Sequence, residues 1–430
     1  MGALAKALFR ELPALVGPEF LEALLKGYPK RDFQIRFWDG TAWGAQRQPR
    51  FTLVLKHPGA LRAMSVSPSE LSVGEAYIYG DFDIEGDIEA AFELAEYVLG
   101  QERGSGETPD LNGRLQRRPG KDHSATSLGT PRLWGEPHSR DRDRRAISYH
   151  YDLPPQFYAL WLDQRMIYSC AYFATPEEDL DCAQERKLDY ICRKLRLRPG
   201  ERLLDIGCGW GGLVMHAAAR YGAQAVGITL SVPQADVARQ RLREADLGDR
   251  CRVEVADYRE IDSVRPYDKI VSVGMFEHVG EELLPEYFSR ARDLLRPGGV
   301  FLNHGIAASA TYRRRGPSFV DRYVFPDGEL VPISTSLRAA ESSGLEVRDV
   351  ESLREHYALT LHQWVRRLEA HADEARRITD DTTYRIWRLY MAGAAQGFRT
   401  GRLNLYQTLL AKPLHGQSGL PLTREDWYRV

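Results

Sequence analysis

Apolar and polar stretches alternate regularly over the last two-thirds of the chain. Short apolar runs of strand length are separated by longer segments whose apolar residues recur at helical spacing. This order predicts an α/β fold, a Rossmann-like, mostly parallel, doubly wound sheet that binds ligands beyond the carboxyl ends of its strands. The expected strands are 202–206, 223–228, 251–255, 267–273 and 299–305, and the expected helices lie near 183–195, 211–221, 231–246 and 283–295.

The remainder of this predicted domain, which spans 148–430, follows the fifth strand. Residues 310–395 are expected to form a largely helical insertion that is rich in aromatic side chains. Residues 403–410 are expected to close the sheet as an edge strand.

The first hundred residues show a different pattern, typical of a small α+β domain. A segment rich in glycine, proline, serine and alternating charge follows at 101–147; it has few apolar residues and is predicted to be a flexible linker. Within the small domain we expect helices at 1–27, 68–79 and 88–99, a hairpin at 33–43 and a strand at 51–55.

A glycine-rich turn follows the first strand of the predicted sheet. Asp205 lies near the end of that strand, and four glycines follow between positions 207 and 212. Gly207, Gly209 and Gly212 fit G-x-G-x-x-G, so a dinucleotide site is one alternative, and a turn without ligand is another. A nicotinamide enzyme requires an acid about 20 residues on. The next strand tip has none, so we favour a nucleoside with an amino-acid tail, as in S-adenosylmethionine.

Composition and charge exclude several classes of function. The 430 residues carry a formal net charge of −2, which argues against a protein that acts mainly on nucleic acid. The five cysteines show neither C-x-x-C pairs nor zinc spacing, which indicates a reduced compartment and no metal site. The chain has no apolar run of about 18 residues and no signal peptide, so we expect a cytoplasmic protein without a membrane span.

Polar side chains also gather at or near the ligand edge of the predicted sheet. A single histidine or tyrosine is more often a satisfied structural residue than a ligand. Glu277 is a stronger candidate, because a carboxylate between aromatic residues at a strand tip has little solvation and requires a partner. The segments concerned are 168–173, 276–278, 303–306 and His356-Tyr357.

Six ordered motifs combine these segments with the glycine turn: YSCAYF (168–173), LLDIGCGWGG (203–212), GITLS (227–231), VSVGMFEHVG (271–280), FLNHGIA (301–307) and YVFPDG (323–328). As a set they closely resemble the cyclopropane-fatty-acyl-phospholipid synthases. These class I methyltransferases add the methyl carbon of S-adenosylmethionine across a cis double bond of a membrane phospholipid. The resemblance runs from about Tyr149 to Leu410, and more faintly through 74–77 in the first domain.

The resemblance implies a mechanism. Because an alkene is a poor nucleophile, the sulfonium methyl must be held close to the double bond and in line with it. Transfer leaves a carbocation on the acyl chain, which aromatic faces stabilise until a base removes a proton and the ring closes. Family members hold a bicarbonate ion for this step, and we expect it to donate to a carboxylate. Its implied ligands here are Cys170, Glu277, His304, the backbone of Ile306 and Tyr357.

The same resemblance implies a set of cofactor contacts, which Asp205 of the glycine turn completes. Cys208 is expected to be a packing residue, because no general base lies beside it in the motif. His150, His278 and His362 are expected to be structural. The implied contacts are Tyr168, Ser169, Gly207, Gly209, Thr229, Leu230, Gln234 and Asp257.

Two departures from the family pattern bear on substrate shape and closure. Where the family usually has Gly-Asn after its His-Tyr-Asp segment, this chain has Leu153-Pro154-Pro155, which stiffens a loop expected over the cofactor. After His304 it has Gly305-Ile306-Ala307 in place of the common Thr-Ile-Gly.

Together these features predict an enzyme that binds the inner membrane surface peripherally and modifies unsaturated phospholipids, with the first domain engaging lipid. A homodimer is expected from the family alone. A methyl- or methylene-branched product, or methylation of a small molecule, is the alternative within the same fold. The complete base set favours ring closure, and the extra domain argues against a small amine. A lipid-binding or transfer protein with a vestigial methyltransferase domain is the non-enzyme alternative.

Overall fold

The computed structural model describes residues 21–22, 25–57, 59–60, 69–100, 133–262, 264–311 and 318–428. Most of the helix predicted at 1–27, and the predicted linker up to residue 132, lie outside these residues. The chain divides into two compact units. The first unit comprises 1–130, 314–323 and 381–396, and the second comprises 131–313, 324–380 and 397–430.

The first unit contains a four-stranded sheet of order β2-β1-β3-β4. The predicted hairpin forms, with β1 and β2 antiparallel and Ile35 opposite Trp43. One strand, β4, was not predicted, although buried Phe82 and Ile84 alternate in it with more exposed acids. The elements are β1 (Phe33–Arg36), β2 (Ala42–Gly44), β3 (Phe51–Leu55), α4 (Glu70–Ile78), β4 (Phe82–Gly86) and α5 (Ile88–Gly100).

Helix α4 carries the segment 74–77 of the weak family resemblance. The helix begins at Ser69, whose side chain accepts from the Ser72 amide in a capping box. Gly74 packs against the ring of Phe319 in α13 (Phe319–Tyr323), and an added Cβ would lie 2.4 Å from that ring. The Tyr323 hydroxyl donates to Glu75 at 2.8 Å. This segment therefore has a packing role within the first unit.

Two buried arginines of α17 (Asp381–Arg399) complete the first unit. Arg385 donates to the backbone carbonyls of Tyr77 and Phe82, at 2.8 and 2.9 Å. Arg388 donates to the carbonyl of Ile84 at 3.0 Å. The predicted range of residues 1–100 is therefore incomplete, because it omits the helix α17 that donates to the buried carbonyl groups of this unit.

We expect Arg385→Met to destabilise the first unit by about 3 kcal/mol, because it leaves buried carbonyls without their charged donor. Hydrogen-exchange mass spectrometry should show faster exchange in β3 and β4 and unchanged exchange in the second unit. Arg36→Met is the matched control, since Arg36 pairs with Glu85 at the surface, where side chains are 39% and 55% exposed. Equal exchange in the two variants would contradict this role of Arg385.

The second unit contains a seven-stranded sheet of order β10-β11-β9-β8-β5-β6-β7. Its five predicted strands are present, and neighbours among them pair in parallel, which confirms the doubly wound class. These strands are β5 (Arg202–Ile206), β6 (Gln224–Thr229), β7 (Cys251–Val255), β8 (Tyr267–Val273) and β9 (Leu295–Ala308).

The antiparallel side of the sheet differs from the prediction. The expected edge strand is present as β11 (Leu403–Ala411), but it lies between β9 and β10 (Glu346–Ser352), so the edge prediction is wrong. The edge belongs to β10 within the region expected to be helical. Charged side chains are typical of an edge strand. Because these residues interrupt the apolar alternation, the sequence pattern did not predict β10.

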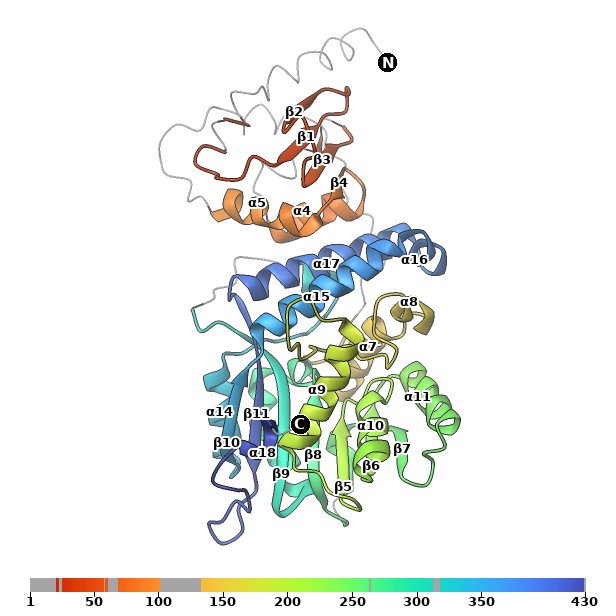
Figure 1. The fold of residues 1–430 in the computed structure, drawn as a ribbon, viewed down its shortest axis with the longest axis vertical. Helices are drawn as coiled ribbons and strands as arrows, with labels where there is room; N and C mark the ends of the chain where they lie inside the picture. The colour runs from red at the N-terminus through yellow and green to blue at the C-terminus, as the bar shows by residue number, and fades with distance from the viewer. Residues whose placement is uncertain are drawn as a thin grey trace. The chain divides into compact units, whose positions relative to one another are not determined.

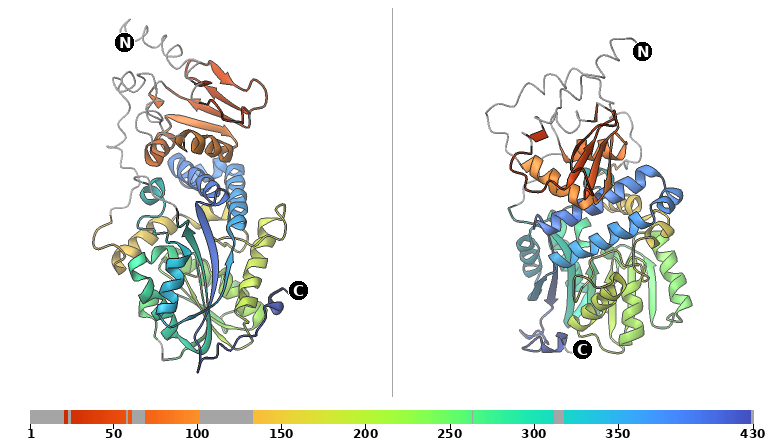
Figure 2. Two further views of the ribbon diagram at one scale, coloured as in Figure 1. Left: turned by 90° about the vertical axis from the view of Figure 1, so that its left-hand side faces the viewer. Right: turned by 45° about the horizontal axis from the view of Figure 1, so that its top comes forward.

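Helices cover both faces of this sheet (Figures 1 and 2). Successive residues point to opposite faces, so Leu203 packs in a core with α9, α10 and α11, while Leu204 packs in a core with α12 and α14. Because β5 to β9 run parallel, their carboxyl ends lie at one edge of the sheet. The helices are α9 (Leu180–Lys194), α10 (Gly212–Tyr221), α11 (Val232–Glu244), α12 (Leu284–Leu294) and α14 (Ile333–Ser342).

The end of the predicted linker is helical, which corrects its boundary at residue 147. Helix α7 begins at Arg140, and two of its charged residues are held in partly buried ion pairs: Arg142 binds Asp327 at 2.5 and 2.8 Å, and Asp143 accepts from Arg259 at 3.0 Å. The remaining helices of the second unit include α7 (Arg140–Tyr151), α8 (Pro155–Ala159), α15 (Arg354–Ala370), α16 (Ala372–Ile378) and α18 (Glu425–Tyr428). In the described part of the chain, no helix is long and apolar enough to cross a membrane.

Candidate active site

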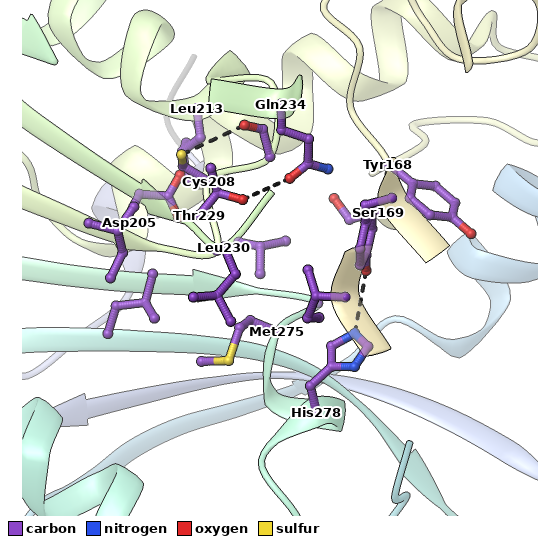
Figure 3. Close-up of a pocket in the computed structure, with 18 of the residues that line it drawn as sticks. Tyr168, Ser169, Asp205, Cys208, Leu213, Thr229, Leu230, Gln234, Met275 and His278 are labelled. Atoms are coloured by element: carbon purple, nitrogen blue, oxygen red, sulfur yellow. Dashed lines mark hydrogen bonds between the residues drawn. The ribbon is translucent and has the colours of Figure 1, made fainter. Parts of the chain in front are cut away.

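A pocket opens at the carboxyl ends of β5, β6, β7 and β8, with further walls from α7 and the segment before α9 (Figure 3). This is the edge at which a doubly wound sheet binds its ligands. The nine residues predicted to contact the cofactor all line it: Tyr168, Ser169, Asp205, Gly207, Gly209, Thr229, Leu230, Gln234 and Asp257.

The glycine turn forms the floor of this pocket. Gly207 has φ +84°, a conformation that other residues rarely adopt, and an added Cβ would lie 2.8 Å from Cβ of Met275. The amides of Gly207 and Cys208 both donate to the carbonyl of Ile228 at 2.9 Å, which ties the turn to β6. Gly211 then begins α10. Position 207 therefore has no room for a side chain and presents its backbone to a ligand.

Polar side chains on the neighbouring strand ends are held by their own contacts. The Thr229 hydroxyl donates to Gln234 Oε1 at 2.8 Å, so the amide nitrogen of Gln234 faces the pocket (Figure 3). Asp257 receives three hydrogen bonds from Arg259, from the backbone amide at 3.0 Å and from two guanidinium nitrogens at 2.9 and 2.6 Å. These contacts fix the donors and acceptors before a ligand arrives.

Asp205 is the buried acid of the pocket. Its side chain is 2% exposed, and Oδ1 has no hydrogen-bond partner among the described residues. Burial raises the pKa of this carboxyl to about 7. A buried carboxylate oxygen without a partner suits a ligand that brings hydrogen-bond donors, as the amino-acid tail of S-adenosylmethionine does.

The residues predicted to hold bicarbonate form a second group. The backbone amide of Ile306 donates to Glu277 Oε1 at 2.7 Å. Glu277 Oε2 and His304 Nε2 are buried and have no partner among the described residues. The Gln407 amide lies 3.2 Å from His304 Nδ1; with that amide as donor, the imidazole hydrogen is on Nε2. Glu277 Oε2 is thus a free acceptor and His304 Nε2 a free donor, and Ile306, whose amide binds Glu277, lies two residues after His304 in β9.

Cys170 and Tyr357 join this group through the start of α15. The carbonyl of Leu353 accepts from the Tyr357 amide at 3.1 Å and lies 3.8 Å from the Cys170 sulfur. The Leu353 amide donates in turn to Leu405, which stands opposite Ile306 in the sheet. Burial raises the pKa of the Cys170 thiol above its usual range, so the thiol is protonated at neutral pH.

The two groups adjoin each other. The amide of Gly274, which lines the pocket, donates to the carbonyl of His304 at 2.9 Å. The ring of Trp364 lies 5.2 Å from Tyr168 of the pocket and 6.0 Å from Tyr357 of the second group. The two sets of predicted residues are therefore linked through the backbone at Gly274 and through the ring of Trp364.

Glu277 links this region to the pH dependence of stability. Burial raises the pKa of its carboxyl to about 7, above the value of an unfolded chain. The protonated form thus stabilises the fold at low pH, and that contribution is lost as pH rises through about 7. In the ligand-free wild type, ionisation of Glu277 should therefore lower the free energy of unfolding between pH 5 and pH 8, by roughly 3 kcal/mol at most. Glu277→Gln lacks this carboxyl, so its stability relative to wild type should rise over the same range.

Melting temperatures of the two ligand-free proteins at both pH values test this expectation. Glu282→Gln, which removes an exposed acid of the same segment, should follow wild type. Parallel pH curves for wild type and Glu277→Gln would show that the buried carboxyl is not responsible.

Several pocket residues were not predicted. Tyr151, Lys187, Met275 and His278 line the pocket, although His278 was expected to be structural. Burial lowers the pKa of His278 to about 4, so it is neutral at pH 7. Its ring nitrogen is 3.4 Å from the Tyr151 hydroxyl. The position of His278 beside Glu277, past a strand end, is the signal that could have identified it.

The two departures from the family pattern have local explanations. Pro154 and Pro155 begin α8, where a proline at the first helical position is favourable. Asp152 accepts from the Ser231 hydroxyl at 2.7 Å, which fixes the segment that follows Tyr151. An added Cβ on Gly305 would lie 2.9 Å from the Phe276 ring, so glycine suits that packing.

The sheet topology, the glycine turn and the pocket together define a class I S-adenosylmethionine-dependent methyltransferase, and solved structures support this class. A crystal structure of the mycolic acid cyclopropane synthase CmaA1, described as complexed with SAH and CTAB, superposes with a TM-score of 0.59 at 35% identity. It covers 62% of this chain and 97% of its own.

Within that class, the chain belongs to the mycolic acid cyclopropane synthetase family, whose model matches residues 138–408. Residues 20–98 match a separate family described as a domain of unknown function. A probable fatty acid methyltransferase of Pseudomonas putida is 42% identical over 92% of this chain and 96% of its own. The tuberculostearic acid methyltransferase UfaA1 of Mycobacterium tuberculosis is 35% identical over 87% of this chain and 86% of its own.

Proposed function

We propose that the protein transfers the methyl carbon of S-adenosylmethionine to the cis double bond of an unsaturated phospholipid acyl chain and closes a cyclopropane ring. The observation that carries this proposal is the pair of unpartnered buried atoms, Glu277 Oε2 and His304 Nε2, next to a methyltransferase pocket. Transfer to an amine requires no such buried cluster after the methyl group has moved. Ring closure requires a base at that place.

The pocket residues supply binding and orientation. S-adenosylmethionine, when bound, supplies an electrophilic methyl group on its sulfonium. The glycine turn and the side chains of Thr229, Gln234 and Asp257 would hold it at the sheet edge. The rings of Tyr168 and Tyr357 flank Trp364, and aromatic faces of this kind stabilise positive charge on an acyl chain.

The second group suits an anion that both accepts and donates hydrogen bonds, as bicarbonate does. Glu277 Oε2 can accept a hydrogen bond from the hydroxyl of bicarbonate, and His304 Nε2–H can donate a hydrogen bond to another bicarbonate oxygen. Burial lowers the pKa of His304 well below 6.5, so it stays neutral and does not compete for the proton. A bicarbonate ion held here would supply the base for the last step. The Ile306 amide is already bonded to Glu277, so it orients the carboxylate.

A saturated methyl branch is the second candidate product. Two relatives that span most of the chain are named a probable fatty acid methyltransferase and a tuberculostearic acid methyltransferase, whereas the match to cyclopropane mycolic acid synthase 1 of Mycobacterium tuberculosis covers 61% of it. The free acceptor and donor of the second group favour ring closure, because ring closure requires loss of a proton to a base, whereas a saturated methyl branch requires a hydride from an external reductant.

Labelled methyl transfer to vesicles tests the substrate. The full-length protein is incubated with deuteromethyl S-adenosylmethionine and vesicles of a cis-monounsaturated phosphatidylglycerol or its fully saturated counterpart, and the extracted lipids are analysed by mass spectrometry. We expect label in the unsaturated phospholipid alone. Label in added free oleic acid but not in phospholipid would contradict the phospholipid assignment, and no label in any lipid would contradict the reaction.

A further inference from the structure

Two buried side chains on one face of α9 hold Ser169 at the pocket wall. Gln184 and Lys187 are three residues apart and 0% and 1% exposed. The Gln184 amide donates to the backbone carbonyl of Ser169 at 2.8 Å, and Lys187 Nζ donates to its hydroxyl oxygen at 2.8 Å. A single helix thus fixes this serine at its backbone and at its side chain.

The contact with Lys187 determines whether the Ser169 hydroxyl can donate a hydrogen bond to a ligand. An ammonium group has three donors and no acceptor, so Ser169 Oγ must accept from it. The hydrogen of the serine hydroxyl then remains to be donated to another group. Ser169 and Lys187 both line the pocket, so a bound ligand can receive that hydrogen bond.

Lys187 is also a buried cation without an ion pair. No carboxylate of the described residues lies within 4.0 Å of its ammonium, although burying a charge without a partner is costly. Burial lowers the pKa of Lys187 to about 8, against the influence of Asp163, Cys170 and Asp205, so the side chain is mostly protonated at pH 7. The Lys187 ammonium therefore has no carboxylate in direct contact, and an anionic ligand group can interact with it through Ser169.

We propose that Lys187 is a positioning residue that, through Ser169, selects the α-carboxylate of the amino-acid tail of S-adenosylmethionine. The Ser169 hydroxyl donates to that carboxylate, and the Lys187 ammonium polarises the hydroxyl and balances the charge. This goes beyond the proposed reaction, since it concerns how the cofactor is recognised and not what happens to the acyl chain.

Calorimetric binding of two ligands tests the proposal without turnover. S-adenosylhomocysteine carries the amino-acid tail, and 5′-methylthioadenosine lacks it. In Lys187→Met we expect the Kd for S-adenosylhomocysteine to rise about 30-fold, while the Kd for 5′-methylthioadenosine stays within about twofold. Equal weakening of both ligands, or no weakening of either, would overturn the proposal.

Lys194→Met is the matched control. Lys194 lies on the same helix and is equally buried, but its ammonium pairs with Glu351 and Asp349. Its loss should lower the melting temperature and leave the ratio of the two Kd values unchanged. A changed ratio of the two Kd values in Lys194→Met would show that any disturbance of α9 weakens cofactor binding, and it would overturn the specific role of Lys187.

Ser169→Ala tests the same pathway if Lys187→Met does not fold. It should weaken S-adenosylhomocysteine about tenfold and spare 5′-methylthioadenosine, because it removes the donor and keeps the ammonium. In the double variant the two effects should be less than additive, since one acts through the other. An unchanged ratio of the two Kd values in Ser169→Ala would overturn the proposal.

Discussion

Glu277→Gln should lower the rate of methyl-carbon incorporation into phospholipid by a factor of about 10² to 10⁴. Glu277 has one oxygen on the Ile306 amide and one that is buried and unpartnered. Glutamine keeps the size of the side chain and an oxygen for Ile306, but it cannot carry the charge that organises the proposed base. The rate is measured from labelled lipid under single-turnover conditions.

Cofactor binding separates this effect from a general loss of structure. Glu277→Gln should bind S-adenosylhomocysteine within about twofold of wild type, because the nine predicted cofactor contacts do not include Glu277. Glu282→Gln, an exposed acid of the same segment, should keep the wild-type rate. An unchanged rate in Glu277→Gln would remove this carboxylate from the mechanism, and a parallel loss of cofactor binding would assign it to the pocket.

Gly207→Ala is the second change with a large expected effect, a loss of at least about 100-fold in affinity for S-adenosylhomocysteine. The residue has φ +84°, which costs roughly 1–2 kcal/mol for alanine, and the new methyl group would meet Met275 at 2.8 Å. The turn and Met275 both line the pocket, so any relaxation moves its walls. Isothermal titration calorimetry measures the change.

Gly200→Ala separates backbone strain from the effect on the pocket. Gly200 has φ +81°, almost the same conformation, but nothing lies within 4 Å of an added Cβ and the residue does not line the pocket. It should lose stability and bind S-adenosylhomocysteine within about twofold of wild type. If the two variants lost the same affinity, strain in the backbone alone would account for the result at Gly207.

The position of the pocket could be predicted because parallel strands bring distant residues to one edge. Asp205, Thr229 and Asp257 are far apart in sequence but end neighbouring strands, so strand order alone places them together. The resemblance to a family added Tyr168 and Ser169, which lie before the first core helix and have no pattern of their own. The sequence placed the segment 168–173 near the ligand edge, and the resemblance assigned these two residues to the cofactor.

Other features depend on contacts that no local pattern encodes. Arg385 has the sequence surroundings of a surface residue on an amphipathic helix, yet it satisfies carbonyls of Tyr77 and Phe82 some 300 positions earlier. Lys187 would be expected on a solvated helix face, and only the packed structure shows it buried against Ser169. In both cases the partner lies outside the helix that carries the charged residue, so charge and periodicity predict exposure.

The measurement that tests the central claim most directly is the deuterium content of the lipid product. With deuteromethyl S-adenosylmethionine and a cis-monounsaturated phospholipid, ring closure after loss of one deuteron predicts a product one carbon heavier with two of the three deuterons, resistant to hydrogenation. A product that keeps all three deuterons would show a saturated methyl branch. Two deuterons in a product that takes up hydrogen would show a methylene branch. Either of these products would contradict the proposed cyclopropane synthase.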